Sequence, residues 1–497
     1  MSNELDTMAR ARHAVGSEPL PLLIDGAWLP SASGAVFDVI DPGTGEVVAQ
    51  AARGGAADVD AAVAAARRSF EDQRWRRFSG AERGVILWRL AELIENSIEE
   101  LVGVESLDLG IPLPHSRGMI TEAASVLRYY AGLADKIYGR TVEIGPAERR
   151  VHGYTLREPI GVVGAIIPWN APLLTAVQKI APALTAGCSV VLKPAEETPL
   201  SSMWLGRLVA EAGIPDGVVN IVTGFGDEVG GAIAAHPDVD KVGFTGSTEV
   251  GKKIIVAATG NLKKLTLELG GKSPVLVLPD ADLETAIPGI ATGIFWNSGQ
   301  ICTAGTRLFV HRSVFDQVVE GIADEGRKLK LGYANDPEAD LGPLISQKQL
   351  ERVTGYVESG LADGAELISG GCRRGSRGYF YEPTVVANVN QSMSMVREEI
   401  FGPVIVAMPF DDIDAAVAAA NDTQYGLAAS IWTRDISVAH STAKRIRAGR
   451  VGINVHRAGG AQIPNGGYRQ SGWGREGGPE GLDAYLETKT VVELLDR

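Results

Sequence analysis

The stretch between Pro159 and Val277 alternates two kinds of segment, and this alternation restricts the possible folds most strongly. Short apolar runs rich in β-branched residues, such as SVVLK, VVNIV and KVGFT, are separated by alanine-rich segments of helix length. Strands and helices that alternate in this way form βαβ units, which assemble into a doubly wound parallel sheet. We therefore predict an α/β fold with a Rossmann-type sheet, the commonest platform for nucleotides.

A second α/β region is expected after Pro279, extending to about Gly472. The apolar periodicity there predicts helices over 315–329, 347–360, 413–421 and 437–446, and strands over 404–410, 428–432 and 450–453. The 497 residues leave room for two or three domains. We expect the second region to face the first.

Charge and cysteine content exclude several classes of function. A formal net charge of -14 argues against nucleic acid or an anionic membrane as partner. Three scattered cysteines and seven histidines without metal-ligand spacing indicate neither a disulfide framework nor a metal site. The amino terminus lacks the apolar core of a signal peptide, and no apolar run is long enough to span a bilayer. We expect a cytoplasmic protein.

Cys302 lies in a loop of small residues, FWNSGQICTAGTR, between a predicted helix over 282–295 and a predicted strand over 307–310. A thiol at such a turn is accessible to a ligand, although a lone cysteine also serves often as a small apolar filler. Glu268 ends a second notable stretch, LTLELGGKSP, just before two glycines. A carboxylate held in an apolar site is suited to act as a general base, whereas the alternative is a solvated glutamate at a strand end.

The stretch GFTGSTEVG places glycines at a predicted strand-to-helix transition, where backbone amides and the helix N-terminus can face a pyrophosphate. It departs from the usual G-x-G-x-x-G pattern, so an ordinary glycine-rich turn is an equal alternative.

Seven motifs occur in order along the chain and together resemble one family. They are PWN at 168–170, KPAEETP at 193–199, GFTGST at 243–248, LELGGKSP at 267–274, GQICTAGTR at 299–307, EEIFGP at 398–403 and SGWGRE at 471–476. The sequence resembles the NAD(P)-dependent aldehyde dehydrogenases, specifically the tetrameric class 1 and 2 type, from about Pro21 to the last few residues.

The resemblance implies the reaction and its residues. The Cys302 thiolate attacks an aldehyde, Asn170 and the backbone amide of Cys302 hold the oxyanion, and Glu268 activates the water that hydrolyses the thioester. The implied cofactor-binding residues are Ile167, Trp169, Lys193, Glu196, Gly226, Gly246, Ser247, Gly251, Gln349, Glu399 and Phe401. Because the Glu196 carboxylate accepts hydrogen bonds from ribose hydroxyls and repels a 2′-phosphate, we predict NAD rather than NADP. Without the resemblance, Lys193 and Glu196 would more often be a solvated pair at the end of a strand.

The resemblance also implies an aldehyde dehydrogenase-like fold with a cofactor-binding domain, a catalytic domain and a small β oligomerisation element. We expect a disordered tail over 1–17, a cofactor domain over 18–138 and 158–270, and a catalytic domain over 271–472. A hairpin within 139–157 and a strand within 478–497 are expected to form the oligomerisation element. A homotetramer is the first expectation, with a dimer as the alternative.

The substrate tunnel departs from the bulky, often aromatic lining that is typical of class 1 and 2 enzymes. The positions matched by motif are Ala123, Ala171, Gln178, Gly459 and Asn465, with Trp296 and Ile301 as the large residues near Cys302. Smaller and more polar walls predict a bulky aldehyde, aromatic, terpenoid or steroid-like. The alternatives are that neighbouring groups refill the space and that the substrate is a small aliphatic aldehyde or a semialdehyde.

Two other classes of function compete with a dehydrogenase. A structural or binding protein could keep this framework without turnover, but the predicted catalytic residues are all present. A cysteine hydrolase would need a histidine in a recognisable catalytic context, and none is evident.

Overall fold

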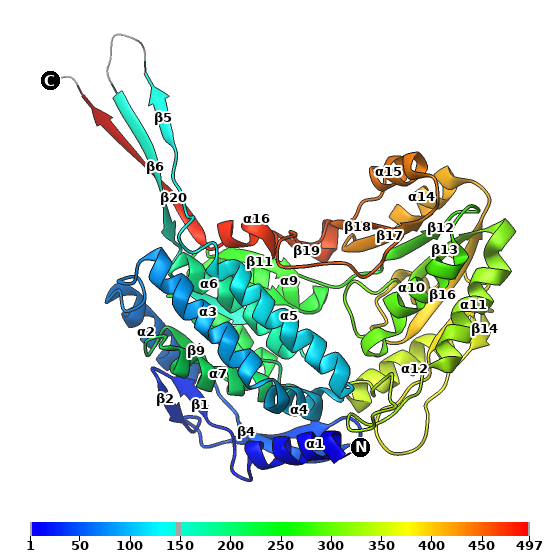
Figure 1. Cartoon of the computed structure of the whole chain (residues 1–497), viewed down its shortest axis with the longest axis horizontal. Helices are drawn as coiled ribbons and strands as arrows, with labels where there is room; N and C mark the ends of the chain where they lie inside the picture. Colours follow the sequence, from blue (N-terminus) through cyan, green and yellow to red (C-terminus); the bar gives the residue numbers. More distant parts are fainter. Residues whose placement is uncertain (1, 146–150, 496–497) are drawn as a thin grey trace.

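The computed structural model describes residues 2–145 and 151–495. Two large sheets, each covered by helices, lie side by side, and a small third sheet extends away from them (Figure 1). The predicted fold class is therefore confirmed.

The first large sheet is built around five parallel strands in the order β9, β8, β7, β10, β11. The order reverses between β7 and β10, as in a doubly wound nucleotide-binding sheet, and ligands bind at such a switch point. Short antiparallel strands extend both edges. The strands of this sheet are β1 (Leu22–Ile24), β2 (Ala27–Leu29), β7 (Val162–Ile166), β8 (Ser189–Lys193), β9 (Val219–Ile221), β10 (Lys241–Thr245), β11 (Lys264–Glu268) and β19 (Gly472–Trp473).

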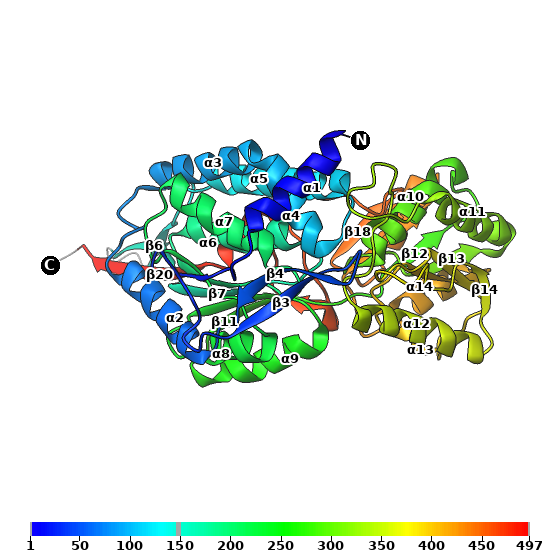
Figure 2. The ribbon, with the colours of Figure 1, turned by 90° about the horizontal axis from the view of Figure 1, so that it is seen from below.

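Helices cover both faces of this sheet (Figure 2). One face is covered by α3 (Gly80–Asn96), α4 (Ile98–Leu109), α5 (Leu113–Ala131), α6 (Pro172–Ala186) and α7 (Leu200–Ala212). The other face is covered by α2 (Ala56–Glu71), α8 (Gly231–Ala235) and α9 (Thr248–Ala257). Helix α3 begins with a capping box, in which the Ser79 hydroxyl accepts from the Glu82 amide and the Glu82 carboxylate accepts from the Ser79 amide. The hairpin of β3 (Val36–Asp41) and β4 (Glu46–Ala52) precedes α2.

The second large sheet has the order β14, β15, β16, β13, β12, β17, β18, and all its strands except β14 run parallel. Its strands are β12 (Pro274–Val277), β13 (Arg307–His311), β14 (Glu366–Ser369), β15 (Thr384–Ala387), β16 (Val404–Phe410), β17 (Ala428–Trp432) and β18 (Arg450–Ile453). Its helices are α10 (Leu283–Phe295), α11 (Phe315–Lys328), α12 (Gln347–Ala362), α13 (Ser394–Arg397), α14 (Ile413–Asn421), α15 (Ile436–Ala443) and α16 (Gly478–Asp483), the last of which packs on α6 of the first unit. Short 3-10 or π turns are η1 (Gly226–Gly230), η2 (Ala258–Gly260), η3 (Trp296–Gly299), η4 (Arg312–Val314) and η5 (Arg469–Ser471).

The small third sheet consists of β5 (Thr141–Ile144), β6 (Val151–Pro159) and β20 (Leu486–Leu494). The C-terminal strand β20 pairs antiparallel with β6 of the same chain along its whole length. The three strands project beyond the helices (Figure 1), and Val142, Leu156 and Val492 are exposed on them. The turn of the predicted hairpin, 146–150, lies outside the described residues.

The predicted disordered tail over 1–17 is wrong. Residues Ser2–Val15 form helix α1, which packs on α4. Met8, Ala11 and Val15 are buried, and their spacing of three and four residues puts them on one face of the helix. The close approach requires Gly103 of α4, because a Cβ there would lie 2.8 Å from the carbonyl oxygen of Thr7. The other domain limits stay predictions. No helix within 2–145 and 151–495 is long and apolar enough to cross a bilayer.

Candidate functional site

One cavity of about 490 Å³ is lined by all three predicted catalytic residues, Cys302, Glu268 and Asn170. They arrive from separate parts of the chain. Glu268 is the last residue of β11, Asn170 lies between β7 and α6, and Cys302 follows η3. The carboxyl ends of the central strands of the first sheet thus meet the cysteine loop of the second unit.

The loop before Cys302 has an unusual backbone. Asn297, Ser298 and Gly299 all have positive φ, from 52° to 70°. Left-handed conformations cost a residue with a Cβ about 1 kcal/mol or more, and such strain is held only where the surroundings impose it. Here the Ser298 hydroxyl donates to the carbonyl of Gly342, at 2.7 Å, and the Gln300 side chain accepts from the amide of Ile345, at 2.9 Å. The loop is therefore fixed ahead of the thiol.

Asn170 is tied to the same loop. The side-chain amide of Asn170 donates to the backbone carbonyl of Gln300, at 2.8 Å. The backbone carbonyl of Asn170 accepts from the Asn297 side chain, at 3.0 Å. An amide nitrogen carries two hydrogens, so one of them stays available to a ligand. Asn170 is buried, which strengthens a hydrogen bond made there.

The thiol of Cys302 is half-buried. Burial raises its pKa to about 12, and the nearby carboxyls of Glu399 and Glu268 add to the shift, while Arg450 opposes it. The thiolate is the nucleophilic form. The thiolate fraction of Cys302 therefore depends on the charges that surround the thiol.

Glu268 is not the solvated strand-end residue of the alternative interpretation, because only 6% of it is exposed. Burial raises the pKa of its carboxyl well above the usual value, and the neighbouring Glu476 raises it further, while Lys179 and Arg475 lower it. Its Oε1 has no hydrogen-bond partner among the described residues. A Cβ at Gly466 would lie 2.8 Å from that oxygen, so glycine leaves the carboxyl its space. These features are those of a buried general base.

The predicted cofactor residues on the first sheet lie at the ends of its strands. Lys193, the last residue of β8, forms an ion pair with Glu196 at 2.6 Å, and the Glu196 side chain remains 30% exposed. The Ser247 hydroxyl caps α9 by accepting from the Val250 amide. Gly246 and Gly251 have packing roles as well, because a Cβ at either would meet the side chain of Phe244 or Leu269 within 2.6 Å.

The second unit contributes the loop that carries Glu399 and Phe401. Glu399 accepts from the amide of Gly271 at 2.9 Å, which holds this loop against the residues that follow Glu268. The Gln349 side chain donates to the carbonyls of Ile400 and Phe401, at 3.1 and 2.7 Å.

The remaining cofactor candidates adjoin this contact or the first sheet. The ring of Trp169 meets that of Phe401 edge-on, with centroids 5.2 Å apart. Ile167 is buried and donates to the carbonyl of Lys193, and Gly226 opens the π turn η1.

Six of the seven predicted substrate residues line the cavity: Ala171, Gln178, Trp296, Ile301, Gly459 and Asn465. Ala123 was predicted wrongly. It is completely buried in the apolar core, whereas Met119, Glu122 and Val126 of the same helix, α5, line the cavity. Successive residues of a helix point about 100° apart, so a shift of one position along α5 moves a side chain from the cavity into the core.

Sequence reasoning missed the charged wall of the cavity, which is formed by Arg450, Arg457 and Glu122. The guanidinium carbon of Arg457 lies 3.6 Å from the ring centroid of Trp296. Arg450 Nη1 lies 3.6 Å from the place where a Cβ of Gly459 would be. The space expected from the small residue at 459 thus adjoins an arginine. The available signal was a pair of arginines that bracket a short strand just before the loop PNGG at 464–467.

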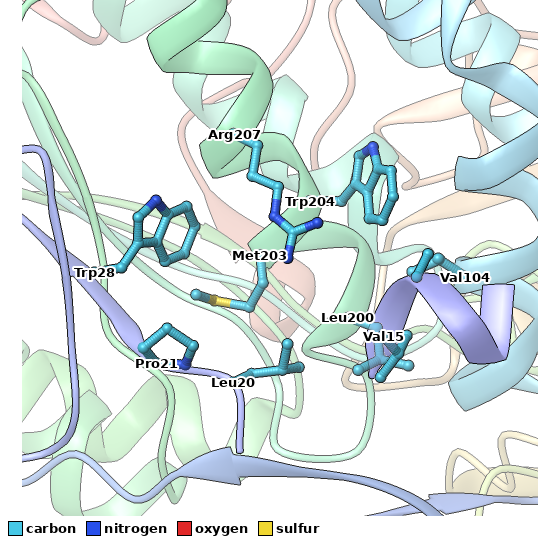
Figure 3. Close-up of a pocket in the computed structure, with 10 residues that line it drawn as sticks. Val15, Leu20, Pro21, Trp28, Val104, Leu200, Met203, Trp204 and Arg207 are labelled. Atoms are coloured by element: carbon cyan, nitrogen blue, oxygen red, sulfur yellow. The ribbon is translucent and has the colours of Figure 1, made fainter. Parts of the chain in front are cut away.

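A second, smaller pocket of about 140 Å³ lies between α1, β2 and α7 (Figure 3). Its walls are apolar side chains such as Leu20 and Met203, together with Arg207. It is separate from the cavity that contains Cys302.

A doubly wound sheet joined to a second α/β unit, with a thiol, an amide and a buried carboxyl at their junction, is the architecture of a cofactor-dependent oxidoreductase. The comparison with known families agrees: the model of the aldehyde dehydrogenase family matches residues 28–491. The chain belongs to the aldehyde dehydrogenase family, as its motifs predicted.

Similar proteins cover nearly the whole chain. A putative aldehyde dehydrogenase, DhaS, of Bacillus subtilis is 47% identical over 96% of both chains. The mitochondrial aldehyde dehydrogenase of Rattus norvegicus is 45% identical over 95% of this chain and 91% of its own. The structure of the NAD+ complex of an aldehyde dehydrogenase from Bacillus cereus matches with a TM-score of 0.95 and 45% identity, covering 97% of this chain and 98% of that one.

Proposed function

We propose that this protein oxidises an aldehyde to a carboxylic acid through a thioester on Cys302, with NAD as the electron acceptor. The observation that carries the proposal is that Cys302, Asn170 and Glu268 line one cavity. The bound NAD+ of the similar Bacillus cereus enzyme supports the choice of acceptor.

The residues of this chain suit NAD. Glu196 offers a partly exposed carboxylate to ribose hydroxyls, and the N-terminus of α9 after Ser247 offers backbone amides to a pyrophosphate. Glu399 and Phe401 would hold the riboside next to Cys302, whose pKa already responds to Glu399. When bound, NAD supplies the hydride acceptor.

In the first step the Cys302 thiolate bonds to the aldehyde carbon, and the carbonyl electron pair moves to oxygen. The free hydrogen of the Asn170 amide and the backbone amide of Cys302 donate to this oxyanion. Removing one such donor typically costs about a hundredfold or more in rate. As the carbonyl re-forms, hydride leaves the carbon and a thioester remains on Cys302.

In the second step Glu268 takes a proton from a water molecule, and the resulting hydroxide attacks the thioester carbon. The carbon–sulfur bond breaks, the acid is released, and the thiolate is regenerated. The free Oε1 of Glu268 is the atom available for this proton. Glu476 faces the same cavity and is paired with Lys179. Glu476 raises the pKa of Glu268, so Glu268 must give up a tightly held proton before it can act as the base.

For the substrate we propose a bulky aldehyde. The cavity volume and the small side chains at Ala171 and Gly459 support it, although Trp296 and Arg457 occupy part of the opening. Small aliphatic aldehydes and semialdehydes are the alternative, and a framework without turnover is a further one.

The projecting sheet supports association of copies of the chain. Exposed apolar residues on β5, β6 and β20 and the free edges of that sheet are suited to pair with another subunit. We propose a homotetramer, with a dimer as the alternative, and sedimentation of the purified chain distinguishes them. The cytoplasmic location stays a prediction.

Cofactor reduction measured with NAD and then NADP, across acetaldehyde, phenylacetaldehyde, citral and a steroid side-chain aldehyde, tests the proposal. We expect a higher specificity constant with NAD and a rise with substrate bulk. A preference for acetaldehyde would reject the bulky substrate, equal use of NADP would reject the role of Glu196, and no turnover would favour the inactive framework.

A further inference from the structure

Two arginines line the catalytic cavity, and neither has a carboxylate partner in the part of the chain that the structure describes. Arg450 is the first residue of β18, and Arg457 follows the same strand in the loop that leads to Gly459. Within 2–145 and 151–495, neither guanidinium forms an ion pair or donates a hydrogen bond. The contact of Arg457 is with the face of Trp296, at 3.6 Å. The stacked ring fixes the guanidinium while leaving its N–H groups in its plane free to bind a ligand.

The other charges of the cavity do not neutralise this pair. Glu122 lies on the same wall as the two arginines and raises the pKa of both, but among the described residues it forms no ion pair with either one. Glu476 is already paired with Lys179. Glu268 holds its proton more tightly than an ordinary glutamate because it is buried. The cavity wall is therefore cationic in a chain whose formal net charge is -14.

The Arg450 guanidinium lies at the wall of the cavity, close to the thiol. Its Nη1 lies 3.6 Å from the place where a Cβ of Gly459 would be, which is an ordinary van der Waals distance. Burial lowers the pKa of Arg450. Arg450 lies close enough to the Cys302 thiol that its charge partly opposes the rise in the pKa of that thiol. A guanidinium remains charged at neutral pH despite such a shift. An unpaired, partly desolvated charge is costly unless a ligand binds it.

We propose that Arg450 and Arg457 are specificity-determining residues that bind an anionic group, best a carboxylate, at the end of the substrate remote from its aldehyde. The planar guanidinium matches a carboxylate in geometry and charge. The substrate class is then an oxo acid, with the aldehyde at Cys302 and the carboxylate on the arginine wall. This inference rests on the proposed aldehyde oxidation and narrows its substrate.

The test compares two substrates that differ in charge but hardly in shape, 4-carboxybenzaldehyde and 4-formylbenzamide, each with saturating NAD. The ratio of their kcat/KM values is measured, because a change in the reactivity of Cys302 affects both and cancels. A series of straight-chain oxo acids against alkanals of the same length covers substrates of other reach. We expect the anionic member of at least one matched pair to be favoured about tenfold or more, the scale of a charge-assisted hydrogen bond.

The substitutions Arg450→Met and Arg457→Met should each lower that ratio severalfold, and the double substitution should bring it close to one. Arg450→Lys, which keeps the charge, should restore part of it. Arg447→Met is the matched control, because that exposed arginine lies three residues before Arg450 and outside the cavity. Melting temperatures of all variants separate binding from folding.

The outcomes distinguish the two proposals. Oxidation of no aldehyde in either set refutes the proposed function itself. Oxidation of neutral aldehydes as fast as their anionic counterparts, or an anionic preference that survives the double substitution, refutes the role of the arginines while leaving the dehydrogenase intact.

Discussion

Lys179, whose side chain is completely buried, forms an ion pair with Glu476, a carboxylate that lines the same cavity as Glu268. The pair has opposite effects on the proposed base: Glu476 raises the pKa of Glu268 and Lys179 lowers it. The affinity of Glu268 for its proton thus depends on a neighbour that needs no contact with the substrate.

Replacing Glu476 with Gln should shift the pH dependence of turnover to lower pH. The change removes a negative charge that raises the pKa of Glu268, so Glu268 loses its proton at a lower pH. The measurement is steady-state kcat against pH. Glu480→Gln, an exposed change four residues away, is the control. A profile that moves upward, or one that moves equally in the control, would contradict this coupling.

Replacing Glu268 with Gln should separate the two halves of the reaction. Without the base, acid release should fall by about a hundredfold or more, while the rapid burst of reduced cofactor on mixing should survive because it needs only Cys302 and Asn170. Mass spectrometry of the stopped reaction should find the acyl group on the protein. An unchanged steady-state rate would remove Glu268 from the mechanism.

Replacing Gln349 with Leu should weaken cofactor binding. The variant loses two hydrogen bonds to the carbonyls of Ile400 and Phe401, which position the loop carrying Glu399. Two such bonds contribute about 1 to 3 kcal/mol, so the KM for NAD should rise about fivefold or more. Gln347→Leu is the matched control, because Gln347 lies on the same helix and its side chain donates to Glu351 rather than to the loop that carries Glu399. A rise in KM of the same size in both variants would refute the assignment.

Two kinds of element were predicted best from the sequence: short strands that are uniformly apolar, and helices that have one apolar and one polar face. The central strands of the first sheet and helices such as α12 and α14 lie where their periodicity put them. Helix α4 was missed because all nine residues from Leu101 to Leu109 are buried, Glu105 and Asp108 included, so no polar face marks it. Helix α1 was missed because its apolar stripe is narrow and belongs to a polar segment.

The site divides in a similar way. The motifs located Cys302, Glu268 and Asn170, which converge because strand ends of one sheet meet a loop of the other unit. The contacts across that junction, such as Glu399 with the Gly271 amide, link residues 128 positions apart and have no local signal. The same holds for Arg457 on Trp296, which only the folded chain brings together.

Two buried carboxyls of α4 cap other helices, and this arrangement carries the last prediction. Glu105 accepts from the amide of Leu173 at the start of α6, at 3.0 Å, and Asp108 accepts from the amide of Leu200 at the start of α7, at 2.9 Å. Glu105→Leu should leave the Leu173 amide without a partner. Such a loss costs about 1 to 3 kcal/mol, so the melting temperature should fall by roughly 2 to 6 °C. Glu105→Gln keeps an acceptor and should lose less.

The pH dependence of stability gives the sharper form of this test. Burial raises the pKa of Glu105 from 4.5 to about 7. The folded state therefore binds this proton more tightly than the unfolded state does. The stabilisation that comes from this tighter proton binding is complete below pH 4.5 and is lost as the pH rises through about 7. The melting temperature of the wild type relative to Glu105→Gln, which cannot ionise, should fall over that interval. A constant difference between the two proteins from pH 4.5 to 8 would show that folding does not raise the pKa of Glu105.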